Sequence, residues 1–258
     1  MVYYGAVLAW GVQYTIYSVN AAWGDDPTTF FTDTFLQVVP GDTFSWAPAW
    51  AVMIPLALVW ILVLFVIGRG LSKGVEAANK IFLPLLVILF LALVIRALFL
   101  PGAVEGLNAF FTPNWAALAD PKVWLAAFAQ IFYSLSVGFG IMLTYASYLQ
   151  RKSNLTGTAL VAGFANSSFE ILAGIGVFSA VGFMAHQGGV SVSEVEGLSG
   201  PILSFVTFPK IISMMPGGPI FGVLFFSSLV LAGVTSLLSL LQVVSGGLQD
   251  KFGWSPAR

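Results

Sequence analysis

The polar side chains that interrupt the most apolar stretches of this sequence are the groups able to do chemistry. Asn166 and Glu170 lie four residues apart in the apolar stretch 158–184. Positions i and i+4 share one face of a helix, so the amide and the carboxyl group point the same way. An amide oxygen with a carboxylate nearby is typical of a cation site within a membrane. The alternative is a buried Asn–Glu hydrogen bond that holds two helices together.

A second group of oxygen atoms lies in the stretch 220–244. Thr and Ser in apolar helices usually bond back to the carbonyl three or four residues earlier, and for Thr235 and Ser236 this is the carbonyl of Ala232. Such back-bonding is common and needs no ion. The same geometry gathers two hydroxyls and a carbonyl, which is half of the ligand set that a small hard cation takes. The other half has to come from another element.

A third stretch, 124–149, contains residues that disfavour a continuous helix. Ser134 and Ser136 are two apart and cannot share a helix face, and Gly138 and Gly140 each cost a helix about 1 kcal/mol relative to Ala. We expect an interruption near residues 136–140, where freed backbone groups are tolerated only against protein or a water-filled cavity. The alternative is a continuous helix with a packing groove of small residues.

The composition around these groups is that of an integral membrane protein. Of 258 residues, 58% are apolar and 8% are charged, against about 25% charged residues in an ordinary globular protein. The mean hydropathy is +0.93. A net charge of −1 leaves no basic surface for nucleic acid. With no cysteine and one histidine, the sequence predicts neither an enzyme nor an organic cofactor; an intramembrane hydrolase is the weakest alternative.

Six stretches are long and apolar enough to cross a bilayer as helices. They run approximately over residues 1–22, 47–67, 81–100, 124–149, 158–184 and 220–244. The runs are continuously apolar and do not alternate, which favours helices over a barrel. We therefore expect an all-α integral membrane protein with six transmembrane helices, of which the fourth is broken in the middle. The remaining apolar stretch, 201–215, is too short for a span and predicts a short helix on the outer side.

The basic residues predict the orientation of these spans. Seven Lys and Arg residues lie in the loops 68–80 and 150–157 and in the C-terminal tail, and three lie on the opposite side. The positive-inside rule therefore places the two loops and the tail in the cytoplasm. The sequence begins inside one apolar stretch and ends soon after another, so we expect it to be part of a longer protein.

With these residues in hand, the sequence resembles the neurotransmitter:sodium symporter family, in its bacterial amino-acid-transporting branch. The resemblance covers essentially the whole chain, as the third to eighth core spans of that family. It is strongest over Gln130–Tyr148, Gly68–Gly74 and Ala232–Ser236. The family has an inverted-repeat fold of five plus five helices. The resemblance implies that residues 1–100 end the first repeat and that residues 101–258 start the second.

The resemblance also implies two sodium sites, each completed by helices that this sequence lacks. Ser134 and Asn166 would belong to the first site. The carbonyl of Ala232 and the hydroxyls of Thr235 and Ser236 would form half of the second.

The remaining roles implied by the resemblance concern the substrate. Tyr4 would bind the substrate carboxylate, Tyr133 would be an aromatic lid, and Gln130 and Tyr133 would close the outer gate. The other implied pocket residues are Ser136, Phe139, Ser236 and Leu240. Glu170 falls where chloride-dependent animal relatives have Ser, so its carboxylate would substitute for chloride.

The implied function is sodium-coupled symport of an amino acid across the plasma (inner) membrane by alternating access. Phe139 and Leu240 favour an apolar amino acid. The expected partners are the amino acid, sodium ions, the lipid bilayer and the missing helices of the same chain, without nucleic acid; the fragment alone would be inactive. The alternative is a channel or structural membrane subunit whose polar helix positions only mediate packing.

Overall fold

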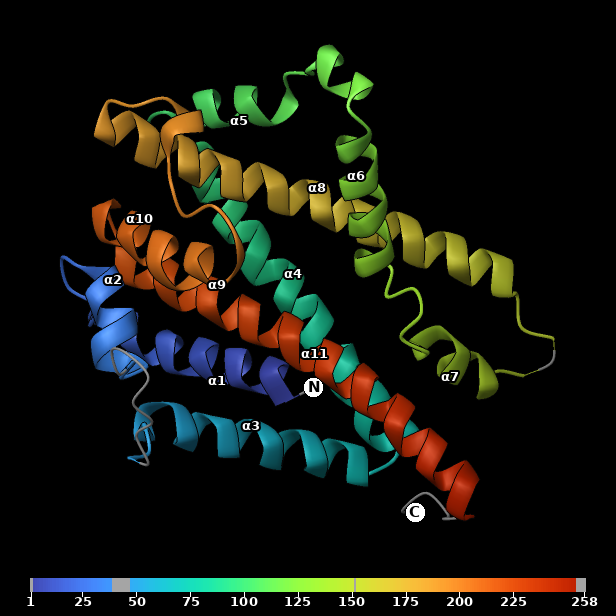
Figure 1. The fold of residues 1–258 in the computed structure, drawn as a ribbon. Coiled ribbons are helices and arrows are strands. Elements are labelled where there is room, and N and C mark those ends of the chain that lie inside the picture. The colour runs from blue at the N-terminus through green and yellow to red at the C-terminus, as the bar shows by residue number, and fades with distance from the viewer. Residues whose placement is uncertain (1, 39–46, 151, 254–258) are drawn as a thin grey trace.

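The computed structural model describes residues 2–38, 47–150 and 152–253, and every regular element in these ranges is a helix (Figure 1). Four described helices are long and apolar enough to cross a membrane. They are α3 (Trp50–Gly68), α4 (Ala77–Leu98) with the π-helical turn η2 (Leu71–Glu76) before it, α8 (Leu155–Gly188) and α11 (Gly218–Phe252).

The other two predicted spans are occupied by shorter helices. The first is α1 (Val2–Tyr17), with 16 residues. The fourth is divided into α6 (Pro121–Ser134) and α7 (Ile141–Ser147). The prediction of an all-α membrane protein with a broken fourth span is thus confirmed.

The helix ends differ from the predicted span ends because capping residues, and not apolarity, decide where a helix stops. The α8 helix begins before residue 158 because the Asn154 Oδ1 accepts a hydrogen bond of 2.9 Å from the Gly157 N–H. It continues past residue 184 to a left-handed Gly189. His186 therefore lies in the last turn of α8, where its Nδ1 is 3.5 Å from the Glu105 carboxylate. The α11 helix is likewise bounded by Gly217 and Gly253.

Short helices gather at one end of the molecule. They are α2 (Pro27–Thr29), η1 (Phe30–Phe35), α5 (Ala103–Phe111), η3 (Trp115–Ala119), η4 (Val192–Glu194), α9 (Gly200–Ile202), η5 (Leu203–Thr207) and α10 (Phe208–Met214). The short helix expected over 201–215 is formed by α9, η5 and α10, with Phe208 and Ile211 buried. Asp26 caps α2, and its hydrogen bonds from Thr29 hold the pKa of the Asp26 carboxyl below its usual range.

The long helices pack with α1 between α3 and α11, and with α4 against both α11 and α8. In Figure 1, the end of α3, the start of α8 and the end of α11 lie at one end of the bundle, opposite α2, α9 and α10. The helix α5 lies along α8 at very close range, because a Cβ atom on Gly106 would stand 1.8 Å from the Phe178 carbonyl oxygen.

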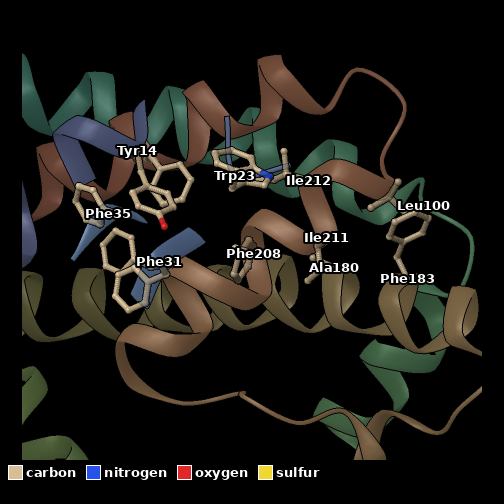
Figure 2. Packing of buried hydrophobic residues seen from close by; sticks show 12 residues of the cluster. Tyr14, Trp23, Phe31, Phe35, Leu100, Ala180, Phe183, Phe208, Ile211 and Ile212 are labelled. Atoms are coloured by element: carbon tan, nitrogen blue, oxygen red, sulfur yellow. The ribbon is translucent and has the colours of Figure 1, made fainter. Parts of the chain in front are cut away.

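An aromatic core holds these helices together at the end where α2, α9 and α10 lie (Figure 2). Tyr14 of α1 is fully buried at its centre, and its ring centroid is 5.1 Å from those of both Phe205 and Phe226. Trp23 stacks on Tyr14, and its Nε1 donates to the Ser213 hydroxyl of α10 at 2.8 Å. This core fixes α1 relative to α11 and α10.

A second, aliphatic core continues between the same helices toward the other end. It joins Leu8 of α1 and Val63 of α3 to Leu237 and Leu238 of α11, all of which are buried. The two cores together set the rotation of α1 against α11, and with it the placement of Tyr4 against the turn 232–236.

Candidate ion and substrate site

The break in the fourth span is a structural feature of the backbone itself. The helix α6 ends at Ser134, α7 begins at Ile141, and a non-helical link joins them (Figure 1). Ser136, Gly138 and Gly140 have φ angles of 53°, 84° and 77°. A residue with a Cβ is strained in this left-handed region and glycine is not, so the two glycines make the link possible. A continuous helix with a groove of small residues is therefore excluded.

Asn166 meets Ser134 at the point where α6 ends. The Asn166 Nδ2 donates a hydrogen bond to the Ser134 hydroxyl, which ties the last residue of α6 to the middle of α8. Both side chains are half-buried. The bond leaves the Asn166 Oδ1 and a lone pair on the Ser134 oxygen free to accept, which are two neutral oxygens of the kind that ligate an alkali ion.

Glu170 lies one turn further along α8, on the face of Asn166, and is exposed. In the part of the chain that the structure describes, its carboxylate has no hydrogen bond or ion pair. The alternative raised from the sequence, an Asn166–Glu170 hydrogen bond, is thus not formed between these two described residues.

The turn 232–236 of α11 carries the second group of oxygens. The Thr235 hydroxyl donates to the Ala232 carbonyl at 2.8 Å, as predicted. Ser236 does not share this carbonyl: its hydroxyl interacts with the phenol of Tyr4 on α1. The expectation that both hydroxyls bond to the Ala232 carbonyl was therefore wrong for Ser236, whose hydroxyl lies toward the phenol of Tyr4 on another helix.

A cavity of about 180 Å³ lies between α1 and α11 beside this turn. Its lining includes Tyr4, Ala232 and Ser236. The phenol of Tyr133 on α6 is close enough to interact electrostatically with Tyr4. Two residues expected around the substrate, Tyr4 and Ser236, therefore line one cavity, and Tyr133 lies outside its lining.

The other residues expected at the substrate and gate are spread more widely. Tyr133 and Phe139 are 68% and 48% exposed, on the side of α6 and of the link that the described helices leave uncovered. Leu240 is half-buried on α11, one turn beyond Ser236. Among the described residues, the side chains of Gln130 and Ser136 form no hydrogen bond with this group.

The atoms of this site that could ligate an ion are the neutral oxygens of hydroxyl, amide and carbonyl groups. The described residues hold no cluster of three or more His, Cys, Asp or Glu side chains. Hydroxyl, amide and carbonyl oxygens suit a monovalent hard cation better than a transition metal, which takes imidazole or thiolate ligands.

Two polar contacts beside the site were missed from the sequence. The Tyr145 hydroxyl of α7 donates to the Ser239 hydroxyl of α11 at 2.8 Å, and the Gln242 Nε2 donates to the Tyr148 hydroxyl at 3.1 Å. On each helix the two partners are three residues apart, which places them on one face. That spacing is visible in the sequence, but nothing in it pairs α7 with a helix 94 residues away.

Comparison with known proteins gives the family. The family described as "Sodium:neurotransmitter symporter family" matches residues 18–257. An uncharacterized sodium-dependent transporter of Methanocaldococcus jannaschii is 39% identical over 98% of this chain and 51% of its own length. The sodium- and chloride-dependent creatine transporter 1 of Homo sapiens is 34% identical over 86% of this chain and 34% of its own.

A solved structure agrees with these relatives. The crystal structure of MhsT in complex with L-phenylalanine matches with a TM-score of 0.77 and 35% identity, over 99% of this chain and 54% of that chain. This chain thus spans about half the length of MhsT and of the archaeal relative. The proteins of the matched family are transporters and not enzymes. The chain belongs to the sodium:neurotransmitter symporter family.

Proposed function

We propose that this protein carries an amino acid across the membrane in symport with sodium ions, by alternating access. The observation that carries the proposal is the meeting of Asn166 with Ser134 where α6 ends. A side-chain amide and a hydroxyl from two helices, at a break in an apolar span, are a site for an ion and not for lipid. The full activity needs helices beyond this chain, which spans about half of MhsT.

The first sodium ion binds to Asn166 Oδ1 and the Ser134 hydroxyl. The carbonyls in the last turn of a helix carry partial negative charge, so the end of α6 adds a favourable field for a cation. The remaining ligands come from helices outside this chain.

The second sodium ion binds beside the turn 232–236 of α11. The Thr235 hydroxyl donates its proton to the Ala232 carbonyl and keeps its own lone pairs for the ion, and the Ala232 carbonyl oxygen is a second ligand beside it. Ser236 supplies the third oxygen, and exchanges its Tyr4 contact for the ion when the site fills. The rest of this site also lies outside the chain.

The substrate occupies the space between α1, the break and α11. The phenol hydroxyl of Tyr4 donates a hydrogen bond to the substrate carboxylate. Tyr133 covers the substrate, and together with Gln130 it closes the outer gate. Phe139, Leu240, Ser136 and Ser236 line the pocket. Because Phe139 and Leu240 offer apolar surface, the substrate is an apolar amino acid; MhsT itself was crystallised with L-phenylalanine.

Glu170 supplies the negative charge that two sodium ions beside a zwitterion require. A fixed carboxylate near the first site offsets the excess positive charge without a bound anion. Transport is then independent of chloride. The two ions and the substrate share a site, so each lowers the free energy cost of binding the others, and this coupling is reciprocal.

The protein spans the plasma (inner) membrane, with loops 68–80 and 150–157 and the C-terminal tail in the cytoplasm. In Figure 1, the end of α3, the start of α8 and the end of α11 lie at the same end of the bundle. This arrangement supports placing the basic residues that flank these helix ends on one side of the membrane. Residues 1–100 belong to the first repeat and residues 101–258 to the second.

The test uses the product of the complete reading frame that contains this sequence, reconstituted in liposomes. We expect labelled L-phenylalanine or L-leucine to accumulate against its gradient only under an inward sodium gradient, and dissipation of that gradient with an ionophore to stop accumulation. Flux that is indifferent to sodium would favour a channel. Absence of both flux and sodium-dependent amino-acid binding would favour a structural subunit.

A further inference from the structure

The helix α7 is attached to the rest of the described structure mainly through α11. It has seven residues and follows the link with two left-handed glycines, Gly138 and Gly140. A short helix after such a link moves as a unit when its contacts loosen. What holds α7 on α11 therefore decides the position of the inner half of the broken span.

One of its contacts leads by hydrogen bonds to the turn 232–236. The Tyr145 hydroxyl donates to Ser239 Oγ at 2.8 Å, and Ser239 Oγ donates to the Thr235 carbonyl at 3.1 Å. The Thr235 hydroxyl in turn donates to the Ala232 carbonyl at 2.8 Å. Two side-chain hydrogen bonds thus join α7 to Thr235, and a third continues from Thr235 to Ala232.

We propose that Tyr145 and Ser239 are positioning residues that couple sodium binding at the turn 232–236 to the docking of α7 on α11. This rests on the proposed function, which assigns that turn to the second sodium ion. Neither Tyr145 nor Ser239 touches the ion; they act through Thr235.

The coupling between α7 and the turn 232–236 follows from the two hydrogen bonds of the Ser239 hydroxyl. The Ser239 hydroxyl has one proton, and a donor at its oxygen polarises that proton toward the Thr235 carbonyl, which strengthens the second bond. When α7 leaves, Ser239 loses this donor and the turn loses one constraint on its geometry. Docked α7 therefore favours the arrangement of Ala232 and Thr235 that binds the ion. By linkage, the ion favours docked α7 by the same factor.

The neighbouring contact provides a matched control. Tyr148 lies one turn after Tyr145 and accepts a hydrogen bond from Gln242, which is 5% exposed. In the described structure, this contact joins α7 to α11 without a further hydrogen bond to the turn 232–236. Loss of the Tyr148 hydroxyl weakens the docking of α7 but leaves its dependence on sodium intact.

The experiment is hydrogen–deuterium exchange on the full-length protein in sodium and in choline, combined with sodium titration of amino-acid binding. In the unaltered protein, sodium slows exchange of the α7 amides, residues 141–147. In Tyr145→Phe this slowing disappears and the sodium concentration for half-saturation rises about 3- to 10-fold, the worth of one net hydrogen bond. In Tyr148→Phe, exchange rises by the same factor with and without sodium, and half-saturation stays within about twofold.

Ser239 variants complete the test. Ser239→Ala reproduces Tyr145→Phe, and the double variant adds nothing further, because both remove one pathway. Ser239→Thr keeps the hydroxyl and should retain the sodium effect on α7. If Ser239→Ala acted only by disturbing the packing of α11, keeping the hydroxyl would not retain that effect. A Tyr145→Phe protein with an unchanged sodium effect on α7 overturns the inference and leaves the proposed function standing. An unaltered protein that binds amino acids without regard to sodium overturns the proposed function itself.

Discussion

At the scale of single residues, the oxygens proposed to bind sodium are neutral and come from different helices. Asn166 and Ser134 are joined by a hydrogen bond, and Thr235 is bonded to Ala232. The Asn166 Oδ1 and the Ser134 and Thr235 hydroxyl oxygens each keep a lone pair after these bonds are made, so the proposed sites are held in shape before an ion arrives. That preorganisation lowers the cost of binding.

Asn166→Ala removes one proposed ion ligand together with the bond to Ser134. We expect the sodium concentration for half-maximal amino-acid binding to rise by about tenfold, the effect of losing one hydrogen bond to a charged group. Ser167→Ala is the control, since Ser167 is adjacent and exposed but lies on another face of α8. Equal sodium dependence in Asn166→Ala and the unaltered protein would remove Asn166 from the site.

Glu170→Ser removes the fixed negative charge beside the proposed first sodium site. We expect the unaltered protein to transport equally well in chloride and in gluconate, and the variant to require chloride, because an anion must then replace the lost carboxylate. Glu170→Asp keeps a carboxylate and should remain independent of chloride. Equal transport by Glu170→Ser in both anions would contradict this role.

At the scale of elements, the break between α6 and α7 depends on backbone conformation. Gly138 has a φ of 84° and open space around its missing Cβ, so a side chain there meets strain and no clash. A substitution at Gly138 therefore tests the backbone conformation of the link and not its packing.

Gly138→Ala should therefore lower the free energy of unfolding by about 1–2 kcal/mol, the cost of the left-handed region for a residue with a Cβ. Gly163→Ala in α8 is the matched control: its Cβ also meets open space, but in a helix, where Ala is favoured by about 1 kcal/mol. The measurement is thermal unfolding of both variants in detergent. Opposite shifts are expected, and a stabilised Gly138→Ala would show that the link is not held in this conformation.

At the scale of the whole molecule, the site depends on an aromatic core that lies away from it. Trp23 is bonded to Ser213, and Tyr14 packs against rings from η1, η5 and α11 (Figure 2). Since these rings hold α1 against α11 at one end, they also decide where Tyr4 meets Ser236.

Phe226→Ala tests this core. Phe226 is fully buried against Tyr14, Trp23 and Phe205, and its truncation should cost about 3–5 kcal/mol. We expect a lower unfolding temperature, together with weaker amino-acid binding because α1 and α11 lose their alignment. Ile220→Ala, at an exposed position near the start of α11, should change little. Similar unfolding temperatures for the two variants would show that the core does not support the site.

The six apolar segments and the break could be predicted from the sequence, because length, apolarity and the glycines at 138 and 140 are local properties that act wherever the chain lies. The sequence also singled out Asn166 and Thr235, since a polar group in an apolar helix stands out without any knowledge of its neighbours. The exact helix ends were less accessible, because caps such as Asn154 act beyond the apolar run.

The pairing of polar groups from different helices could not be predicted from the sequence and came from the three-dimensional fold. Ser236 lies near Tyr4 and forms no side-chain hydrogen bond with Ala232 in the described structure, and Tyr145 donates a hydrogen bond to Ser239, 94 residues away. Such choices follow from how helices are rotated and packed against one another, and packing is set by the summed contacts of many side chains. No local pattern holds that information, so the partners of each oxygen came from the fold.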